Sequence, residues 1–142
     1  MPIRKGSARW NGNLMDGKGV FNTETGVLNN TPFTAKSRFE SGKESNPEEV
    51  LGAAHAGCYS MALAAAITKA GFTVNSISTE DSVHIEKKPD GWTITKIDIN
   101  TVADIKGIDN EAFQKYAMET KSTCPVSKAL KSVEMTLNAK LK

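Results

Sequence analysis

The sequence predicts a single α+β domain in which antiparallel strands are arranged around one long central helix. Three observations carry this prediction. The most apolar segment, residues 50–67, has the length of a helix rather than of a strand. The strand-like segments mostly follow one another through hairpin turns, which gives antiparallel pairing. The 142 residues contain no repeat, low-complexity tract or long linker, so residues 1–142 are expected to form one domain.

The first third of the chain is expected to form three strands. Residues 3–10 and 19–23 are predicted to pair as a hairpin, because the Asn-Gly dipeptide at residues 11–12 is a turn signal. Residues 33–39 alternate in polarity and are predicted to form a third strand. This strand would carry Arg38 on the face opposite its aromatic residues.

The long helix is predicted to begin after Asn46 and to end near Ala70. Asn46 is a favourable cap, Pro47 fits the first turn, and the carboxylates that follow suit the positive end of the helix dipole. Gly71 is a natural terminator. Since this helix is apolar on nearly every side, we expect it to be central and covered all round.

The second half of the chain is predicted to contain a hairpin, two helices and a last strand. Residues 74–86 and 92–103 alternate in polarity on either side of a Lys-Pro-Asp-Gly turn. Asp109 is expected to cap a helix over residues 110–122, and Cys124-Pro125 opens a short helix that ends near residue 130. A final alternating strand, residues 133–141, would close the sheet.

Composition and charge exclude several classes of protein. The formal net charge of +2 provides no basic stripe for a nucleic acid. Residues 50–67 are interrupted by His55, Tyr59 and Ser60 and are flanked by charges, which favours a buried helix over a membrane span. The first residues are not followed by an apolar stretch typical of a signal peptide. We therefore expect a cytoplasmic protein without a membrane or nucleic-acid partner.

The two cysteines leave two interpretations open. They are too few for a disulfide scaffold, and neither they nor the two histidines have metal-ligand spacing, so no metal site is expected. Cys58 lies among small residues and is, taken alone, typical of a core thiol. Cys124 stands at a helix start, where free backbone N–H groups favour a thiolate. The pair is therefore either inert or redox-active.

Two motifs resemble the OsmC/Ohr family, and more closely its osmotically inducible OsmC branch. These are the segment NPEEVLGAAHAGC, which ends at Cys58, and the segment CPVSKAL, which begins at Cys124. The resemblance implies the OsmC/Ohr-like fold and a thiol peroxidase that reduces organic hydroperoxides and, more weakly, hydrogen peroxide. It implies that Cys58 is the peroxidatic cysteine and that Cys124 resolves its sulfenic acid to a disulfide.

The resemblance also implies further site residues and partners. Glu48 matches the active-site glutamate of the family, and Arg38 matches the arginine of the OsmC branch. The other branch takes its arginine from the N-terminal segment, so Arg4 or Arg9 competes for that role. An intertwined homodimer with two sites at the subunit interface is implied. No bound cofactor is implied, and an external dithiol, lipoyl-type or thioredoxin-like, would reduce the disulfide.

The positions of Cys58, Glu48 and His55 along the predicted helix carry three further expectations. Cys58 lies in the middle of its helix, so no helix N-terminus is expected to activate it and it needs a cation such as Arg38. Glu48 precedes Cys58 by ten residues, about 15 Å along a helix, so the site role that the resemblance implies would place it beside the partner's cysteine, holding Arg38 by a bidentate contact. The alternative is that Glu48 only stabilises the start of its helix. His55, one turn before Cys58, is either a general base or a core histidine.

Two rival functions remain at this stage. The protein could be a redox switch, or a binder of lipophilic molecules, that keeps the fold without turnover. It could also be a structural dimer whose cysteines are inert.

Overall fold

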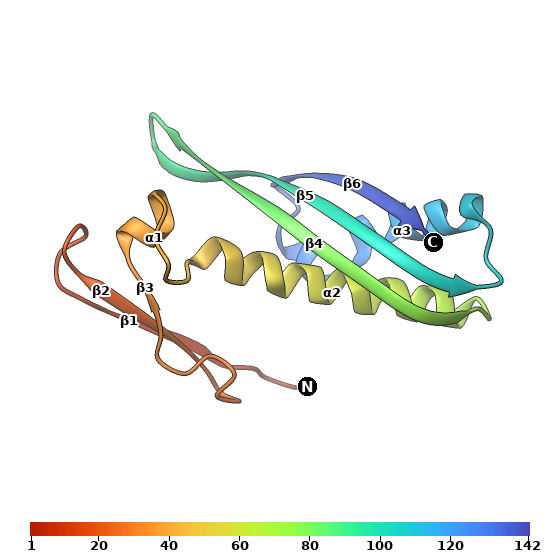
Figure 1. Ribbon diagram of the computed structural model, residues 1–142, viewed down its shortest axis with the longest axis horizontal. Helices are drawn as coiled ribbons and strands as arrows, with labels where there is room; N and C mark the ends of the chain where they lie inside the picture. The colour runs from red at the N-terminus through yellow and green to blue at the C-terminus, as the bar shows by residue number, and fades with distance from the viewer. The chain divides into compact units, whose positions relative to one another are not determined.

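A computed structural model describes residues 1–142 and divides into two compact units, Met1–Val50 and Leu51–Lys142 (Figure 1). The single domain predicted from the sequence stays a prediction.

The first unit is built on a three-stranded antiparallel sheet in the order β1-β2-β3. Its strands are β1 (Gly6–Asn11), β2 (Lys18–Thr23) and β3 (Thr31–Phe33). The predicted hairpin between the first two strands is confirmed, with Gly6 opposite Thr23. Phe33 stacks on Phe21 at 4.0 Å between ring centroids, so an aromatic cluster covers one face of the small sheet.

The predicted strand over residues 33–39 is wrong, because only Phe33 belongs to a strand and a short helix, α1 (Ala35–Phe39), follows. Thr34 caps this helix. Its hydroxyl accepts a hydrogen bond from the Ser37 backbone N–H, and the Ser37 hydroxyl accepts one from the Thr34 N–H. This reciprocal capping box satisfies backbone groups locally, and it outweighs the alternating polarity that favoured a strand.

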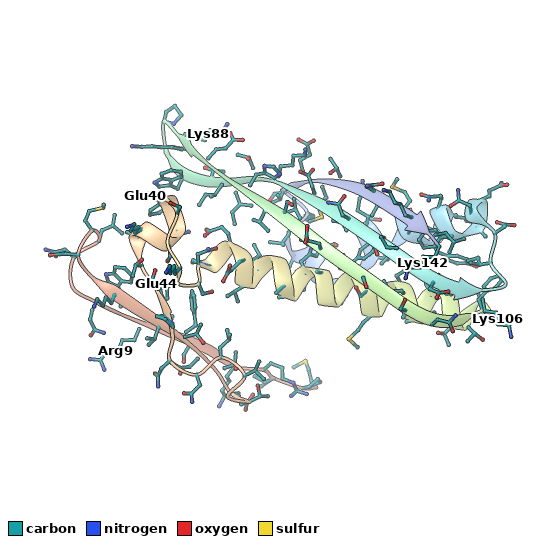
Figure 2. All side chains as sticks on the ribbon, in the orientation of Figure 1. Arg9, Glu40, Glu44, Lys88, Lys106 and Lys142 are labelled. Atoms are coloured by element: carbon teal, nitrogen blue, oxygen red, sulfur yellow. The ribbon has the colours of Figure 1, made fainter.

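The second unit combines one long helix with a three-stranded sheet and two shorter helices (Figure 1). Lys88 and Lys106 mark the two ends of its long hairpin in Figure 2. The helix α2 begins in the first unit, and its sequence-based start and end are confirmed to within a residue. The elements are α2 (Pro47–Lys69), β4 (Thr73–Lys88), β5 (Gly91–Lys106), α3 (Asn110–Thr123), α4 (Pro125–Ala129) and β6 (Glu134–Leu141).

The last strand corrects the expected all-antiparallel pairing. β4 and β5 pair antiparallel, but β6 runs parallel to β5, with Lys96 opposite Glu134 and Ala103 opposite Leu141. The cause is the connection, because α3 and α4 together carry the chain back to the starting end of β5 before β6 begins. A helical crossover of this length is what a parallel pair requires.

The core of the second unit lies between α2, β5 and α3. Tyr59 and Leu63 from α2, Ile97 and Ile99 from β5, and Phe113 from α3 are fully buried together. At about 25 cal/mol per Å² of apolar surface, each large side chain of this kind contributes roughly 1.5–3 kcal/mol. This packing fixes the rotation of α2 about its axis and therefore the direction in which its cysteine points.

The expectation that α2 is covered all round is wrong for the single chain. One face packs on the sheet, where a Cβ added at Gly52 would meet Val83 at 3.3 Å. The opposite face is exposed. A Cβ added at Gly57 would meet nothing within 4 Å, and Met61 is 78% exposed. The small residues of α2 therefore serve two different surfaces.

Candidate active site

The two cysteines meet inside the second unit. Cys58 lies in the middle of α2, and Cys124 is both the last residue of α3 and the cap of α4. Both thiols are free, and they lie at the start of α4, where Cys58 Sγ accepts from the Val126 backbone N–H and Cys124 Sγ accepts from the Ser127 backbone N–H. The sequence alone did not show this proximity, because 65 residues and three further elements, β4, β5 and α3, separate the two positions.

Access to solvent distinguishes the two sulfurs. Cys124 is fully buried, whereas Cys58 is partly exposed. The Val126 backbone N–H, in the first turn of α4, donates a hydrogen bond to Cys58 Sγ at 3.5 Å. The expectation that no helix N-terminus assists Cys58 is therefore wrong, since the assistance comes from another helix rather than from its own.

Burial and hydrogen bonding shift the two thiols in opposite directions. Burial raises the pKa of Cys58, and the Val126 N–H opposes that shift only in part. Burial also acts to raise the pKa of Cys124, but hydrogen bonds from the hydroxyl and backbone N–H of Ser127 and from the Cys58 thiol outweigh it. The net pKa of Cys124 lies below its ordinary value. The groups around the cysteine pair thus favour a thiolate at the buried sulfur.

A continuous line of buried polar groups ends at Cys124. Asp81 in β4 contacts the His55 ring through Nδ1. His55 Nε2 lies 2.7 Å from the Ser127 hydroxyl, which lies 2.9 Å from Cys124 Sγ. The Ser127 backbone N–H also donates to Cys124 Sγ at 3.3 Å. His55 therefore reaches Cys124 through a serine and is not positioned as a base for Cys58.

Sequence reasoning missed Asp81 and Ser127. A usable signal existed for Asp81, because it occupies an inward position of β4, between Thr79 and Val83, where apolar residues are expected. Ser127 gave no such signal, since a serine in the first turn of a helix is ordinary.

Arg38 and Glu48 form the predicted ion pair within the first unit. Arg38 Nη2 lies 2.9 Å from Glu48 Oε1, and Nε lies 3.1 Å from the same oxygen and 3.3 Å from Oε2. Glu48 is buried, and the guanidinium also stacks over the Phe39 ring at 5.2 Å. This two-point contact holds the guanidinium in one orientation.

The competing arginines have other partners. Arg4 donates to the neighbouring Ile3 carbonyl, and Arg9 donates to the Asn11 side chain; both are exposed (Figure 2 labels Arg9). Neither is paired with a buried carboxylate, so Arg38 has the structural support that a site residue requires.

An apolar pocket of about 280 Å³ lies beside Arg38 in the first unit. Its walls are mostly hydrophobic, and Arg38 supplies the charged group at its edge. The lining residues are Trp10, Leu14, Phe33, Thr34, Ala35, Arg38 and Phe39. Such a lining suits an apolar molecule that carries one polar end.

The remaining candidates have structural roles. Tyr59 and Leu63 belong to the core, and the Tyr59 hydroxyl donates to the Ala117 carbonyl at 2.9 Å. His84 is exposed on β4 and pairs with Asp98. No group of three or more His, Cys, Asp or Glu side chains is arranged to hold a metal ion.

Comparison with known proteins places this geometry in a family. The sequence model of the family described as OsmC-like protein matches residues 40–138, which include both cysteines and Glu48. The chain belongs to the OsmC-like family. Peroxiredoxin OsmC of Escherichia coli (strain K12) is 45% identical over 139 residues, which cover 98% of this chain and 96% of that protein. At this identity and coverage, the chain is a cysteine-based peroxidase and a peroxiredoxin-like stress protein.

Other relatives are more distant in sequence. The uncharacterized protein YmaD of Bacillus subtilis (strain 168) is 28% identical over 140 residues, which cover 95% of this chain and 91% of that protein. The crystal structure of the organic hydroperoxide resistance protein OhrB of Bacillus subtilis superposes with a TM-score of 0.68 at 23% identity, covering 99% of this chain and 98% of that one. An OsmC organic hydroperoxide resistance protein from Legionella pneumophila superposes with a TM-score of 0.71 at 19% identity, covering 99% of both chains. These likenesses confirm the OsmC/Ohr-like fold predicted from the sequence.

Proposed function

We propose that this OsmC-like protein reduces organic hydroperoxides through Cys58 as the attacking thiolate and Cys124 as the resolving thiol. The observation that carries the proposal is that a partly exposed and a fully buried thiol accept hydrogen bonds from adjacent backbone N–H groups of α4, those of Val126 and Ser127. A peroxide from solvent can reach the partly exposed Cys58, whereas Cys124 is fully buried.

The reaction has two steps in the protein. The Cys58 thiolate attacks one oxygen of the O–O bond, which gives a Cys58 sulfenic acid and releases an alcohol. Cys124 then attacks the sulfenic sulfur, so that a disulfide forms and water leaves. An external dithiol reduces this disulfide by exchange. We propose a lipoyl-type dithiol, with a thioredoxin-like donor as the alternative, and no bound cofactor.

Arg38 is proposed to supply the cation that Cys58 needs. Burial raises the pKa of Cys58, so an unassisted thiol would be mostly protonated at neutral pH. The guanidinium stays charged in apolar surroundings, and Glu48 holds it in place. The apolar pocket beside Arg38 supports an organic hydroperoxide, rather than hydrogen peroxide, as the preferred substrate.

A homodimer is proposed to complete the site. Ten residues of one helix separate Glu48 from Cys58, about 15 Å by the helical rise. Because Arg38 is tied to Glu48 of its own chain, the two would act together on the partner's Cys58. The exposed face of α2 around Gly57 and Met61 provides the surface for a second copy.

A cytoplasmic location is proposed because the reaction starts from reduced thiols. α2 is long and apolar enough to cross a membrane by length and composition, but core helices of soluble proteins meet the same criterion. Tyr59, Leu63 and Ile67 of this helix are fully buried in the protein core, which supports the cytoplasmic assignment.

Stopped-flow measurement of thiol loss tests the proposal. Reduced protein is mixed with cumene hydroperoxide, and the wild type is compared with Cys58→Ser and Cys124→Ser. We expect rapid thiol loss in the wild type, none in Cys58→Ser, and an accumulating sulfenic acid in Cys124→Ser. Equal thiol loss in the wild type and Cys58→Ser would contradict the assignment. Sustained turnover with dihydrolipoamide separates a peroxidase from a switch that oxidises once.

A further inference from the structure

We infer that Asp81, His55 and Ser127 form a buried proton relay that removes the thiol proton of Cys124 and so drives the resolving half of the reaction. The inference rests on the proposed function, in which Cys124 attacks the Cys58 sulfenic acid. It assigns a task to three side chains that the peroxide-reducing step does not use.

The relay is drawn from three separate elements of the second unit. His55 comes from α2, Asp81 from β4 and Ser127 from α4. The side chains of His55 and Asp81 are fully buried, and Ser127 is 3% exposed. The contacts run in series, because Asp81 bonds His55, His55 bonds Ser127, and Ser127 bonds Cys124 Sγ.

A structural role alone explains this arrangement poorly. Burying a carboxylate and an imidazole in a core carries a desolvation cost. Well-packed apolar residues in the same positions would not carry this cost. Asp81 is only half satisfied, since its Oδ1 is buried without a hydrogen-bond partner. That unused oxygen leaves the carboxylate able to balance a positive charge on His55. The line also ends on the one sulfur that has no access to solvent, where an internal proton acceptor is needed.

The proton balance of the step is complete. The Cys124 thiol proton passes to Ser127 Oγ as the hydroxyl proton of Ser127 passes to His55 Nε2. The Cys124 thiolate attacks Cys58 Sγ, the S–O bond of the sulfenic acid breaks, and the leaving hydroxide takes a proton from solvent, to which Cys58 is partly exposed, and departs as water. His55 holds the proton from Cys124 and returns it through Ser127 to the Cys124 thiolate when the external dithiol reduces the disulfide. Cys58 sulfur is reduced and Cys124 sulfur is oxidised as the disulfide forms. Asp81 stabilises the imidazolium by its contact with Nδ1.

The titratable groups around the relay agree with this direction of transfer. The contact with Asp81 raises the pKa of His55, and the hydrogen bonds of Ser127 contribute to the lowered pKa of Cys124. Tyr59 also faces this region, and burial raises its pKa so that the phenol stays neutral. Cys58 is the remaining titratable neighbour, and burial favours its thiol form. These are the shifts expected of a thiolate–imidazolium pair bridged by a hydroxyl.

The test separates the two chemical steps in the full-length protein. Cumene hydroperoxide is added to reduced wild type and to Ser127→Ala, and sulfenic acid and disulfide are followed separately over a range of pH. Ser127→Ala should form sulfenic acid within about twofold of the wild-type rate, but form disulfide at least about tenfold more slowly at neutral pH. Its disulfide rate should recover as the pH rises toward the ordinary thiol pKa. Ser127→Thr keeps the hydroxyl and should restore the wild-type profile.

Three further measurements show whether the effect is specific to the relay. Ser122→Ala removes an exposed hydroxyl that bonds only the Glu119 carbonyl, and should leave both steps unchanged. Asp81→Asn is nearly isosteric and should slow disulfide formation as Ser127→Ala does. In a Cys58→Ser background, far-ultraviolet thiolate absorbance should show Cys124 titrating at higher pH once Ser127→Ala is added.

The outcomes distinguish the relay from the function on which it rests. If the wild type forms no sulfenic acid at Cys58, the proposed peroxidase mechanism fails. If sulfenic acid forms, but Ser127→Ala and the wild type give the same disulfide rate and the same pH profile, only the relay is refuted.

Discussion

His55 Nε2 and the Ser127 hydroxyl are 2.7 Å apart in the core of the second unit, although Ser127 lies 72 positions after His55 in the chain. This contact directs the histidine toward Cys124 rather than toward Cys58, one turn further along its own helix. A histidine one turn before a nucleophilic cysteine suggests a base for that cysteine. Here the imidazole contacts Ser127, and through it Cys124, instead of Cys58.

The buried histidine should make stability depend on pH. The contact with Asp81 raises the folded-state pKa of His55 above its ordinary value of 6.5. A raised folded pKa contributes stability that is fully present below pH 6.5 and is lost as the pH rises through the folded value. We therefore expect the difference in free energy of unfolding between the reduced wild type and His55→Asn to fall as the pH rises above 6.5. Denaturant unfolding at several pH values measures this, and a difference that stays constant with pH would contradict it.

Replacing Arg38 should slow attack on the peroxide and leave the protein folded. Arg38→Met removes the charge, and each unit by which the Cys58 pKa rises lowers its thiolate fraction about tenfold at neutral pH. We expect at least about a tenfold lower rate of thiol loss. Arg38→Lys keeps the charge but not the two-point contact with Glu48, so its rate should lie between the two. Arg9→Met is the matched control, and an equal loss of rate there would point to the N-terminal arginine instead.

Mixed dimers should reveal which chain supplies the arginine. Cys58→Ser and Arg38→Met are each expected to be nearly inactive. If Arg38 serves the partner's cysteine, a mixed dimer contains one site with an intact Cys58 and an intact Arg38. Co-refolding the two variants should then restore up to about half the activity per mixed dimer, since one of its two sites is intact. Peroxidase activity that stays at the level of the separate variants, with mixed dimers verified by mass, would show that each chain uses its own arginine.

The exposed face of α2 should be required for the homodimer. Met61 is 78% exposed, so Met61→Lys should leave the single chain folded but place a charge in the proposed interface. We expect sedimentation velocity to show monomers at concentrations where the wild type is dimeric. Met118→Lys, on α3 at 53% exposure, is the matched control and should remain dimeric. If both variants are monomeric, or if both remain dimeric, the exposed face of α2 is not the specific dimer interface.

Local signals in the sequence were sufficient for most of the elements. The cap at Asn46, the terminator Gly71 and the alternating hairpin are properties of short segments, and the structure has them where they were predicted. The strand predicted over residues 33–39 was wrong because this segment carries two competing local signals. A capping box at Thr34 and an alternating pattern occupied the same seven residues, and the capping hydrogen bonds prevailed.

What the sequence determined by itself was the pair of cysteine motifs and the family to which they belong. The tertiary structure decided what surrounds the sulfurs. The parallel pairing of β6, the approach of Val126 to Cys58 and the line from Asp81 to Cys124 all join segments that are distant in the chain. Such contacts depend on how α2 rotates as its apolar face packs on β5 and α3, and that rotation is set by the whole core rather than by any one segment.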